Sequence, residues 1–174
     1  MSDLTLSPPG PIPAPPVAVH RTSHAGRALL VIVAVVTIVV PLLLDAVILR
    51  GAHIDHPAWL PHAKLHAAMS FLAPVALGIG ALVCLLGRPV TDRFVMTVGA
   101  YLAGAFWLVV LGAGLWPGTS YFFVGDPVYG HPLQRPETLG MPNNVATSVL
   151  LIVLVLLGLG LLLGGQRRPS GTST

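Results

Sequence analysis

The titratable groups of this chain are concentrated in one segment, HIDHPAWLPHAKLH, at residues 53–66. The segment holds four of the seven histidines, although charged residues make up only 9% of the chain. Imidazole exchanges protons near neutral pH and is also a frequent metal ligand. We therefore consider two chemistries for this segment, proton transfer and metal binding.

An acidic side chain, Asp45, lies within an apolar stretch that ends near Arg50. In a helix, its position would be roughly 7 Å below the helix end. A carboxylate at that depth in a membrane is costly unless it has a partner, so Asp45 is a candidate functional residue. The structural alternative is an ion pair between Asp45 and Arg50.

Two of the histidines have a helical spacing. If a helix begins at Pro61, a favoured first position, His62 and His66 lie at i and i+4 on one face. His66 then lies at about the depth of Asp45, and Asn144 reaches the same level from the last apolar run. We expect Asp45 and His66 to exchange protons, His62 to relay them and Asn144 to orient the pair. The structural alternative is a polar cluster that holds helix ends together.

Metal binding is the alternative chemistry. His53, His56, His62 and His66 supply up to four imidazoles, and helical i,i+4 histidines can share a zinc ion. The glutamate of an HExxH motif is missing, and Lys64 places a positive charge beside the site. We therefore expect no metal and no cofactor, with a histidine metal site as an alternative. His53 and His56 precede the helix and are expected to be solvated.

Aromatic residues could form the walls of a binding site for an apolar molecule. We assign this role to Trp59 and Trp107, and we add Tyr121 and Glu137 from the long connection at residues 117–142. The aromatic residues of that connection are typical of a membrane interface. The connection could also cover the site as a lid.

The elements that carry these residues are apolar. The chain of 174 residues is 54% hydrophobic and has four apolar runs. Each run has about 20 residues, enough for a helix to cross about 30 Å of hydrocarbon, and none shows a polar face. The sequence predicts an all-α, integral membrane four-helix bundle. We expect its helices at about residues 28–49, 62–87, 93–116 and 144–164.

The bundle domain is predicted to span residues 28–165. Residues 1–27 are expected to be a disordered, proline-rich cytoplasmic tail, and residues 166–174 a second cytoplasmic tail. Six basic residues flank one side of the helices and three flank the other, which predicts a multi-pass protein of the cell membrane with both termini in the cytoplasm. The first group is Arg21, Arg27, Arg88, Arg93, Arg167 and Arg168, and the second is Arg50, Lys64 and Arg135.

The composition limits the partners. A formal net charge of +3 could suggest nucleic acid, but the basic residues are scattered at helix ends, so we expect no nucleic-acid partner. The single cysteine, Cys84, excludes an intrachain disulfide. The expected partners are the lipid bilayer and a lipophilic small molecule, and a homo-oligomer is left open.

The stretch HPAWLPHAKLH resembles a signature, Pro-x-Trp-x-Pro-His-Ala-Lys-x-His, of an uncharacterised family of small four-helix membrane proteins from fungi and actinobacteria. The specific part of the match is about a dozen residues. The resemblance implies the fold and no reaction. In architecture alone, the chain is also similar to the sterol-isomerase and sigma-2-receptor group, whose membrane pocket takes sterol-like ligands; no residue is carried over from that group.

The function predicted from these observations is binding of a lipophilic small molecule in a polar pocket at the outer face. The acid–base residues suit isomerisation or cyclisation of a lipid or terpenoid-like substrate. The alternatives are a non-enzymatic accessory or scaffold protein with a structural polar cluster, and a histidine metal site. Whether the protein is an enzyme stays open.

Overall fold

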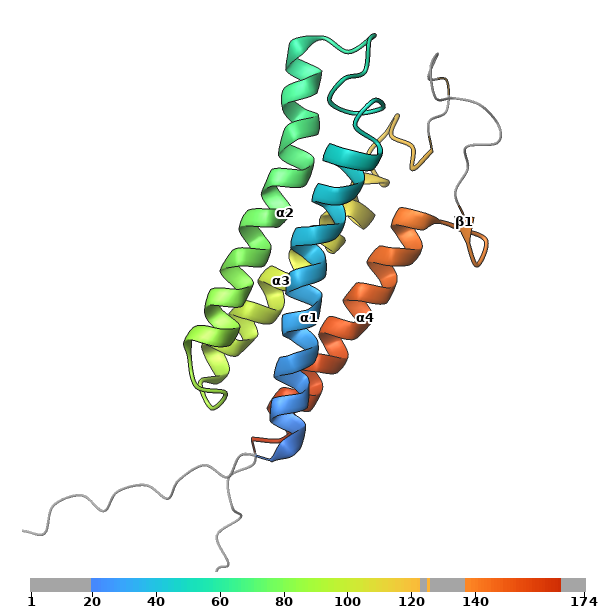
Figure 1. Cartoon of the computed structure of the whole chain (residues 1–174). Helices are drawn as coiled ribbons and strands as arrows, with labels where there is room; N and C mark the ends of the chain where they lie inside the picture. The colour runs from blue at the N-terminus through green and yellow to red at the C-terminus, as the bar shows by residue number, and fades with distance from the viewer. Residues whose placement is uncertain (1–19, 123–124, 126–136, 167–174) are drawn as a thin grey trace, which may run out of the picture.

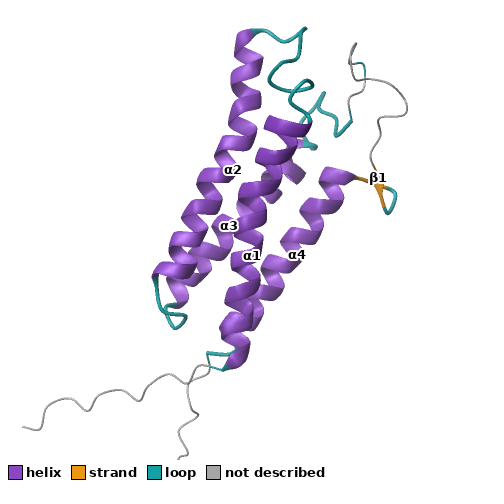
Figure 2. Ribbon diagram, viewed as in Figure 1, coloured by secondary structure: helices purple, strands orange, loops and turns teal. Residues whose placement is uncertain are grey.

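The structure is a computed structural model that describes residues 20–122, 125 and 137–166. Four helices form a bundle, which confirms the predicted all-α class (Figures 1 and 2). The only strands in the described residues are β1 (Glu137–Thr138) and β2 (Met141–Pro142), which pair antiparallel. The helices are α1 (Arg21–Leu43), its π-helical continuation η1 (Leu44–Ile48), α2 (Pro61–Gly87), α3 (Arg93–Ala113) and α4 (Asn143–Gly164).

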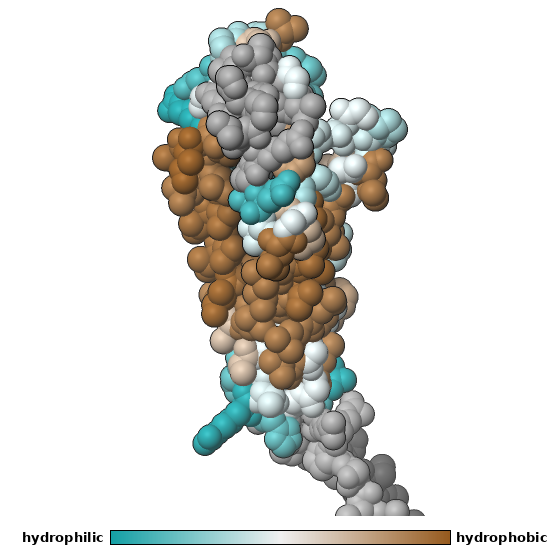
Figure 3. Space-filling model, turned by 90° about the vertical axis from the view of Figure 1, so that its right-hand side faces the viewer, coloured by the Kyte–Doolittle hydropathy of each residue, from teal (hydrophilic) through white to brown (hydrophobic). Residues whose placement is uncertain are grey.

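All four helices are long and apolar enough to cross a membrane. Between 22% and 33% of the most apolar window of each helix is buried inside the bundle, so most of its apolar side chains face outward. Figure 3 shows the result as a hydrophobic band between two hydrophilic ends. Such a surface is stable in hydrocarbon and not in water. The protein is therefore embedded in a lipid bilayer.

The helices form a ring in which α1 and α3 each pack against α2 and α4. Of the two pairs of helices that face each other across the ring, α1 and α3 are in contact. The other pair, α2 and α4, do not meet within the described residues. Figure 1 shows α1 between α2 and α4. The contact between α1 and α3 is therefore the centre of the bundle.

A hydrogen-bonded pair, Thr37 of α1 and Trp107 of α3, joins these two helices in the core. The indole N–H of Trp107 donates to Thr37 Oγ1 over 2.8 Å, and Trp107 is only 4% exposed. The Thr37 hydroxyl lies 2.9 Å from the Val33 carbonyl oxygen and 3.0 Å from that of Ala103, and can donate to either. Both polar side chains thus find partners without water.

Close backbone packing joins the start of α1 to the end of α4. This end of the bundle, where the described chain begins and ends, is here called the terminal end. A Cβ atom on Gly26 would lie 2.4 Å from the Gly158 carbonyl oxygen, so only glycine allows this approach. The Ser23 hydroxyl donates to the Leu162 carbonyl oxygen over 3.0 Å. Small residues at such contacts are typical of membrane helices.

The helix bounds correct two of the predicted domain limits. Helix α1 begins at Arg21 instead of residue 28, so residues 21–27 are helical. The reason is that the face of this segment that carries Ser23 packs against α4. Gln166, expected in the C-terminal tail, is buried, and its side-chain amide donates to the Val90 carbonyl oxygen. Arg93 Nε–H donates to Gln166 Oε1 over 3.0 Å. Apart from His20, whose N–H donates to the Gly165 carbonyl oxygen over 3.1 Å, the rest of both expected tails lies outside the described residues.

The Thr37–Trp107 bond yields a test of the core. Thr37→Val removes the hydroxyl and leaves the Trp107 N–H without an acceptor in hydrocarbon. We expect the free energy of unfolding to fall by about 1–2 kcal/mol. The measurement is reversible unfolding in bicelles with increasing dodecyl sulfate, followed by circular dichroism.

Thr97→Val is the matched control, because Thr97 is exposed and its hydroxyl donates to the Arg93 carbonyl oxygen of its own helix. We expect a change near zero for this variant. An equal decrease in the free energy of unfolding for Thr37→Val and Thr97→Val would contradict a stabilising role of the Thr37–Trp107 hydrogen bond.

Candidate functional site

The opposite end of the bundle carries η1, the connection at residues 49–60 and the first turns of α2, and is here called the histidine end. Asp45 lies in η1, where the Leu49 N–H bonds to the Leu44 carbonyl oxygen over 2.6 Å. Single π turns inside helices occur frequently at functional sites. The acid predicted within the first helix is therefore at an irregular turn near its end.

The partner of Asp45 in this structure is His53. Asp45 Oδ1 lies 3.1 Å from His53 Nδ1, and the side chains are 20% and 21% exposed. The sequence predicted His66 as the partner, with Arg50 as the structural alternative. Arg50 instead pairs with Asp55, and His66 pairs with His62. The structure thus joins Asp45 to a histidine that was expected to be solvated.

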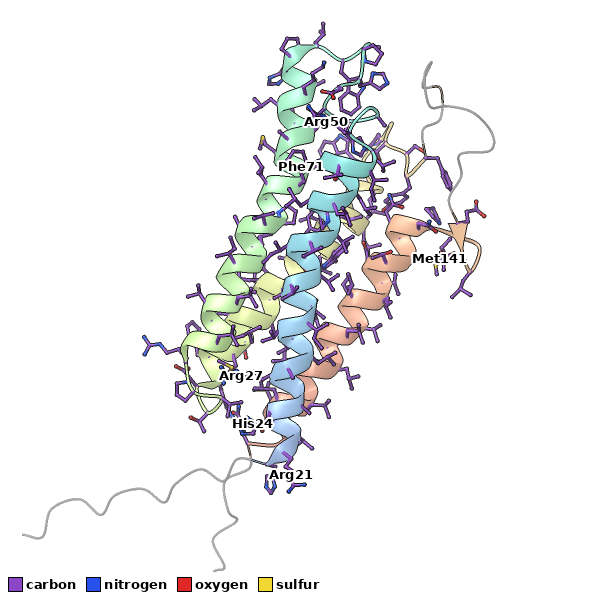
Figure 4. All side chains as sticks on the ribbon, in the orientation of Figure 1. Arg21, His24, Arg27, Arg50, Phe71 and Met141 are labelled. Carbon is purple, nitrogen blue, oxygen red and sulfur yellow. The ribbon has the colours of Figure 1, made fainter. Side chains whose placement is uncertain are left out.

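The connection at residues 49–60 folds back on itself and so positions His53. The His53 N–H lies 3.1 Å from the Leu49 carbonyl oxygen, and the Asp55 N–H bonds to the Arg50 carbonyl oxygen over 2.9 Å. Arg50 Nε–H donates to Asp55 Oδ2 over 2.6 Å at the surface. Figure 4 labels Arg50 at this end of the molecule. An exposed ion pair adds little stability, but this one closes the turn that presents His53 to Asp45.

The indole of Trp59 covers two of the histidines. Its ring centroid lies 5.2 Å from that of His56 and 6.2 Å from that of His53, with both pairs stacked. His56 is only 1% exposed, and its Nδ1 accepts a hydrogen bond from the Ala58 N–H over 3.2 Å. An accepting Nδ1 carries no proton, which places the proton of a neutral His56 on Nε2. The expectation that His56 is solvated is therefore wrong, whereas His53 is partly exposed, with 21% of its side chain accessible.

The other two histidines of the segment form a separate pair. His62 and His66 lie in the first turns of α2, and their Nε2 atoms are 3.1 Å apart. The rings meet edge to face with centroids 4.6 Å apart, and both side chains are exposed. This confirms that the i and i+4 positions share one face of the helix.

The remaining residues predicted for the site lie on other elements. Asn144 is exposed in the first turn of α4, where its Oδ1 accepts from the Val145 N–H. Trp107 lies in the core, bonded to Thr37. Glu137 is exposed in β1. Of the residues predicted to line the binding site, Trp59 is the one that lies near Asp45 among the described residues, because it stacks on His53, which contacts Asp45.

Tyr121 fastens the connection after α3 to that helix. Its hydroxyl donates to the Leu111 carbonyl oxygen over 2.8 Å, and its ring lies against Gly114, where a Cβ would be 2.1 Å from the hydroxyl oxygen. This placement supports a structural role for Tyr121. Half of the predicted lid, residues 123–124 and 126–136, lies outside the described residues.

Metal ligation is limited to pairs of side chains in the part of the chain that the structure describes. No group of three or more histidine, cysteine, aspartate or glutamate side chains there is close enough to hold an ion. A four-histidine site would need His53 and His56 to leave the contacts described above.

No protein-family model matches the chain, and no similar curated protein or solved structure was found. The architecture alone therefore defines the class, a membrane-embedded bundle of four helices. The resemblance based on residues 56–66 stays a prediction.

The burial of the histidines predicts their reactivity toward diethyl pyrocarbonate, which modifies accessible imidazoles. In the folded protein, we expect His62 and His66 to react quickly and His56 slowly, because His56 is shielded by Trp59. Rates are measured by peptide mass spectrometry of protein in lipid nanodiscs. His20 and His24, exposed at the terminal end, are the internal reference for fast reaction.

Denatured protein is the control, in which all these histidines should react at similar rates. Modification of His56 as fast as His62 in the folded state would contradict the packing of the histidine end.

Proposed function

We propose that the histidine end binds a lipophilic small molecule and transfers protons to and from it through Asp45 and His53. The reaction class that fits is isomerisation or cyclisation of a lipid or terpenoid-like substrate. The observation that carries the proposal is the 3.1 Å contact between the Asp45 carboxylate and the His53 imidazole, both about one-fifth exposed.

A carboxylate and an imidazole in contact can hold a proton on either partner, which suits general acid–base catalysis. In an isomerisation, the unprotonated member takes a proton from one substrate carbon, and the protonated member returns one to another carbon. No net proton is consumed. His53 thus takes the role predicted for His66, while Trp59 supplies an apolar wall.

Access from the lipid phase also supports the proposal. Leu44, Val47 and Ile48 of η1 flank Asp45 and are 41%, 64% and 62% exposed. In a membrane, these side chains face hydrocarbon, so a lipophilic molecule can approach η1 without crossing water. An ionisable group beside lipid is costly, which makes Asp45 a candidate for a functional role.

The orientation belongs to the same proposal. Arg21, Arg27, Arg88 and Arg93 lie at the terminal end, and two of them appear at the bottom of Figure 4 with His24 between them. Basic residues of short loops favour the cytoplasmic side. The proposed location is the cell membrane, with the terminal end in the cytoplasm and the histidine end outside.

The second candidate is a non-enzymatic accessory or scaffold protein. The burial of His56 under Trp59 and the closure of the turn by Arg50 and Asp55 support it, because both fasten the connection at residues 49–60. In that case, the Asp45–His53 pair ties η1 to the connection and performs no reaction.

Mass spectrometry of co-purifying lipids separates the two candidates. We compare wild type, Asp45→Asn and the control Asp55→Asn, which removes an exposed carboxylate from the same end. If the pair is catalytic, Asp45→Asn should lower the product-to-substrate ratio of the bound lipid about 100-fold or more. Asp55→Asn keeps Asp45 and His53 and weakens only the exposed ion pair that closes their turn, so it should lower the ratio far less than Asp45→Asn does.

Identical lipid profiles in all three proteins, with the Asp45→Asn bundle intact by circular dichroism, would reject the catalytic proposal. Loss of stability in Asp45→Asn without a change in lipids would favour the accessory role.

A further inference from the structure

The exposed pair His62 and His66 has no part in the proposed reaction, yet its geometry is specific. The two Nε2 atoms converge to 3.1 Å from successive turns of α2, with ring planes at 90°. Without a metal, such a pair shares one proton in a weak hydrogen bond between neutral rings. Two nitrogen lone pairs that can be aimed at one point also form a metal-binding arrangement.

The separation of these atoms fits one ion bound to both. Metal–nitrogen bonds of about 2.0–2.1 Å place two nitrogens about 2.9 Å apart at a right angle and about 3.3 Å apart at the tetrahedral angle. The observed 3.1 Å lies between these limits. An ion could therefore replace the shared proton with small rotations of the rings.

We propose that His62 and His66 bind one divalent transition-metal ion through their Nε2 atoms, with Cu²⁺ preferred. Imidazole favours copper, nickel and zinc over calcium and magnesium, and Cu²⁺ binds most strongly in the series. Binding requires the ring that donates the hydrogen bond to move its proton from Nε2 to Nδ1 by exchange with water, so that both neutral rings carry Nδ1–H and no net proton is released. The site does not depend on the proposed reaction at Asp45.

The surroundings of the pair decide which ion is retained. The N-terminus of α2 places positive charge near the ion and weakens its binding. This cost falls on every divalent cation alike, so only the ion with the strongest bonds to nitrogen binds well. Cu²⁺ is therefore favoured over Zn²⁺.

The pair supplies only part of the coordination. His53 and His56 are held by Asp45, Ala58 and Trp59, and no third donor joins the pair among the described residues. Water or an oxygen ligand from outside the chain completes the coordination sphere. The ion is therefore open to exchange, in contrast to a closed structural metal site.

Electron paramagnetic resonance tests this site. Tag-free, full-length protein in phosphatidylcholine nanodiscs receives one equivalent of Cu²⁺. We expect a spectrum with hyperfine coupling to two imidazole nitrogens, and about one tightly bound ion per chain. His62→Ala and His66→Ala should each lower the Cu²⁺ affinity about tenfold or more, measured by competition with a chelator.

Two controls match these variants. The double variant His20→Ala/His24→Ala removes two exposed histidines that also lie four residues apart, and it should bind Cu²⁺ as wild type does. The double variant His66→Ala/Lys64→His keeps the number of imidazoles but moves one to another face of α2, and it should bind as weakly as His66→Ala.

Equal Cu²⁺ affinity of wild type, His62→Ala and His66→Ala would overturn the proposal, as would loss of binding only in the His20/His24 variant. If an alanine variant fails to fold by circular dichroism, His66→Gln replaces it. Asp45→Asn should bind Cu²⁺ normally, so failure of the metal site and failure of the proposed reaction are distinguishable.

Discussion

Hydrocarbon supplies no hydrogen-bond partners, and this constraint determines how the helices meet. Each polar side chain within the apolar spans must bond to the protein itself. The Trp107 N–H of α3 donates to the Thr37 hydroxyl oxygen of α1, and the Ser23 hydroxyl donates to a backbone carbonyl oxygen of α4. These bonds select which faces of the helices touch, while the outward faces need only be apolar. Near the end of the first helix, the Asp45 carboxylate lies against the His53 imidazole.

Packing is tighter at the terminal end than in η1, although Ala52 and His56 in the connection after η1 are buried. Gly26 and Gln166 sit in tight contacts at the terminal end, whereas η1 contains no buried residue. Regions with few buried contacts open more easily. The polar pair therefore lies where the bundle can change shape locally at low cost, while the core around Trp107 holds the helices in place.

The sequence predicted the elements well because their signals are local. Apolar runs of sufficient length set the four helices, and the i,i+4 spacing placed His62 and His66 on one face. The partner of Asp45 could not be predicted, because it depends on the π turn at η1 and on the path of residues 49–60. The burial of His56 depends on the stacking of Trp59. The early start of α1 at Arg21 likewise reflects packing against α4 and not local propensity.

The central claim is that Asp45 contacts His53 and not His66. Double-mutant cycles on the free energy of unfolding test it directly, with Asp45→Asn combined once with His53→Gln and once with His66→Gln. Residues in contact show coupling of about 0.5–3 kcal/mol, and distant residues are additive within about 0.5 kcal/mol. We predict coupling in the first cycle and additivity in the second. Additivity of Asp45 with His53, together with coupling to His66, would contradict this account.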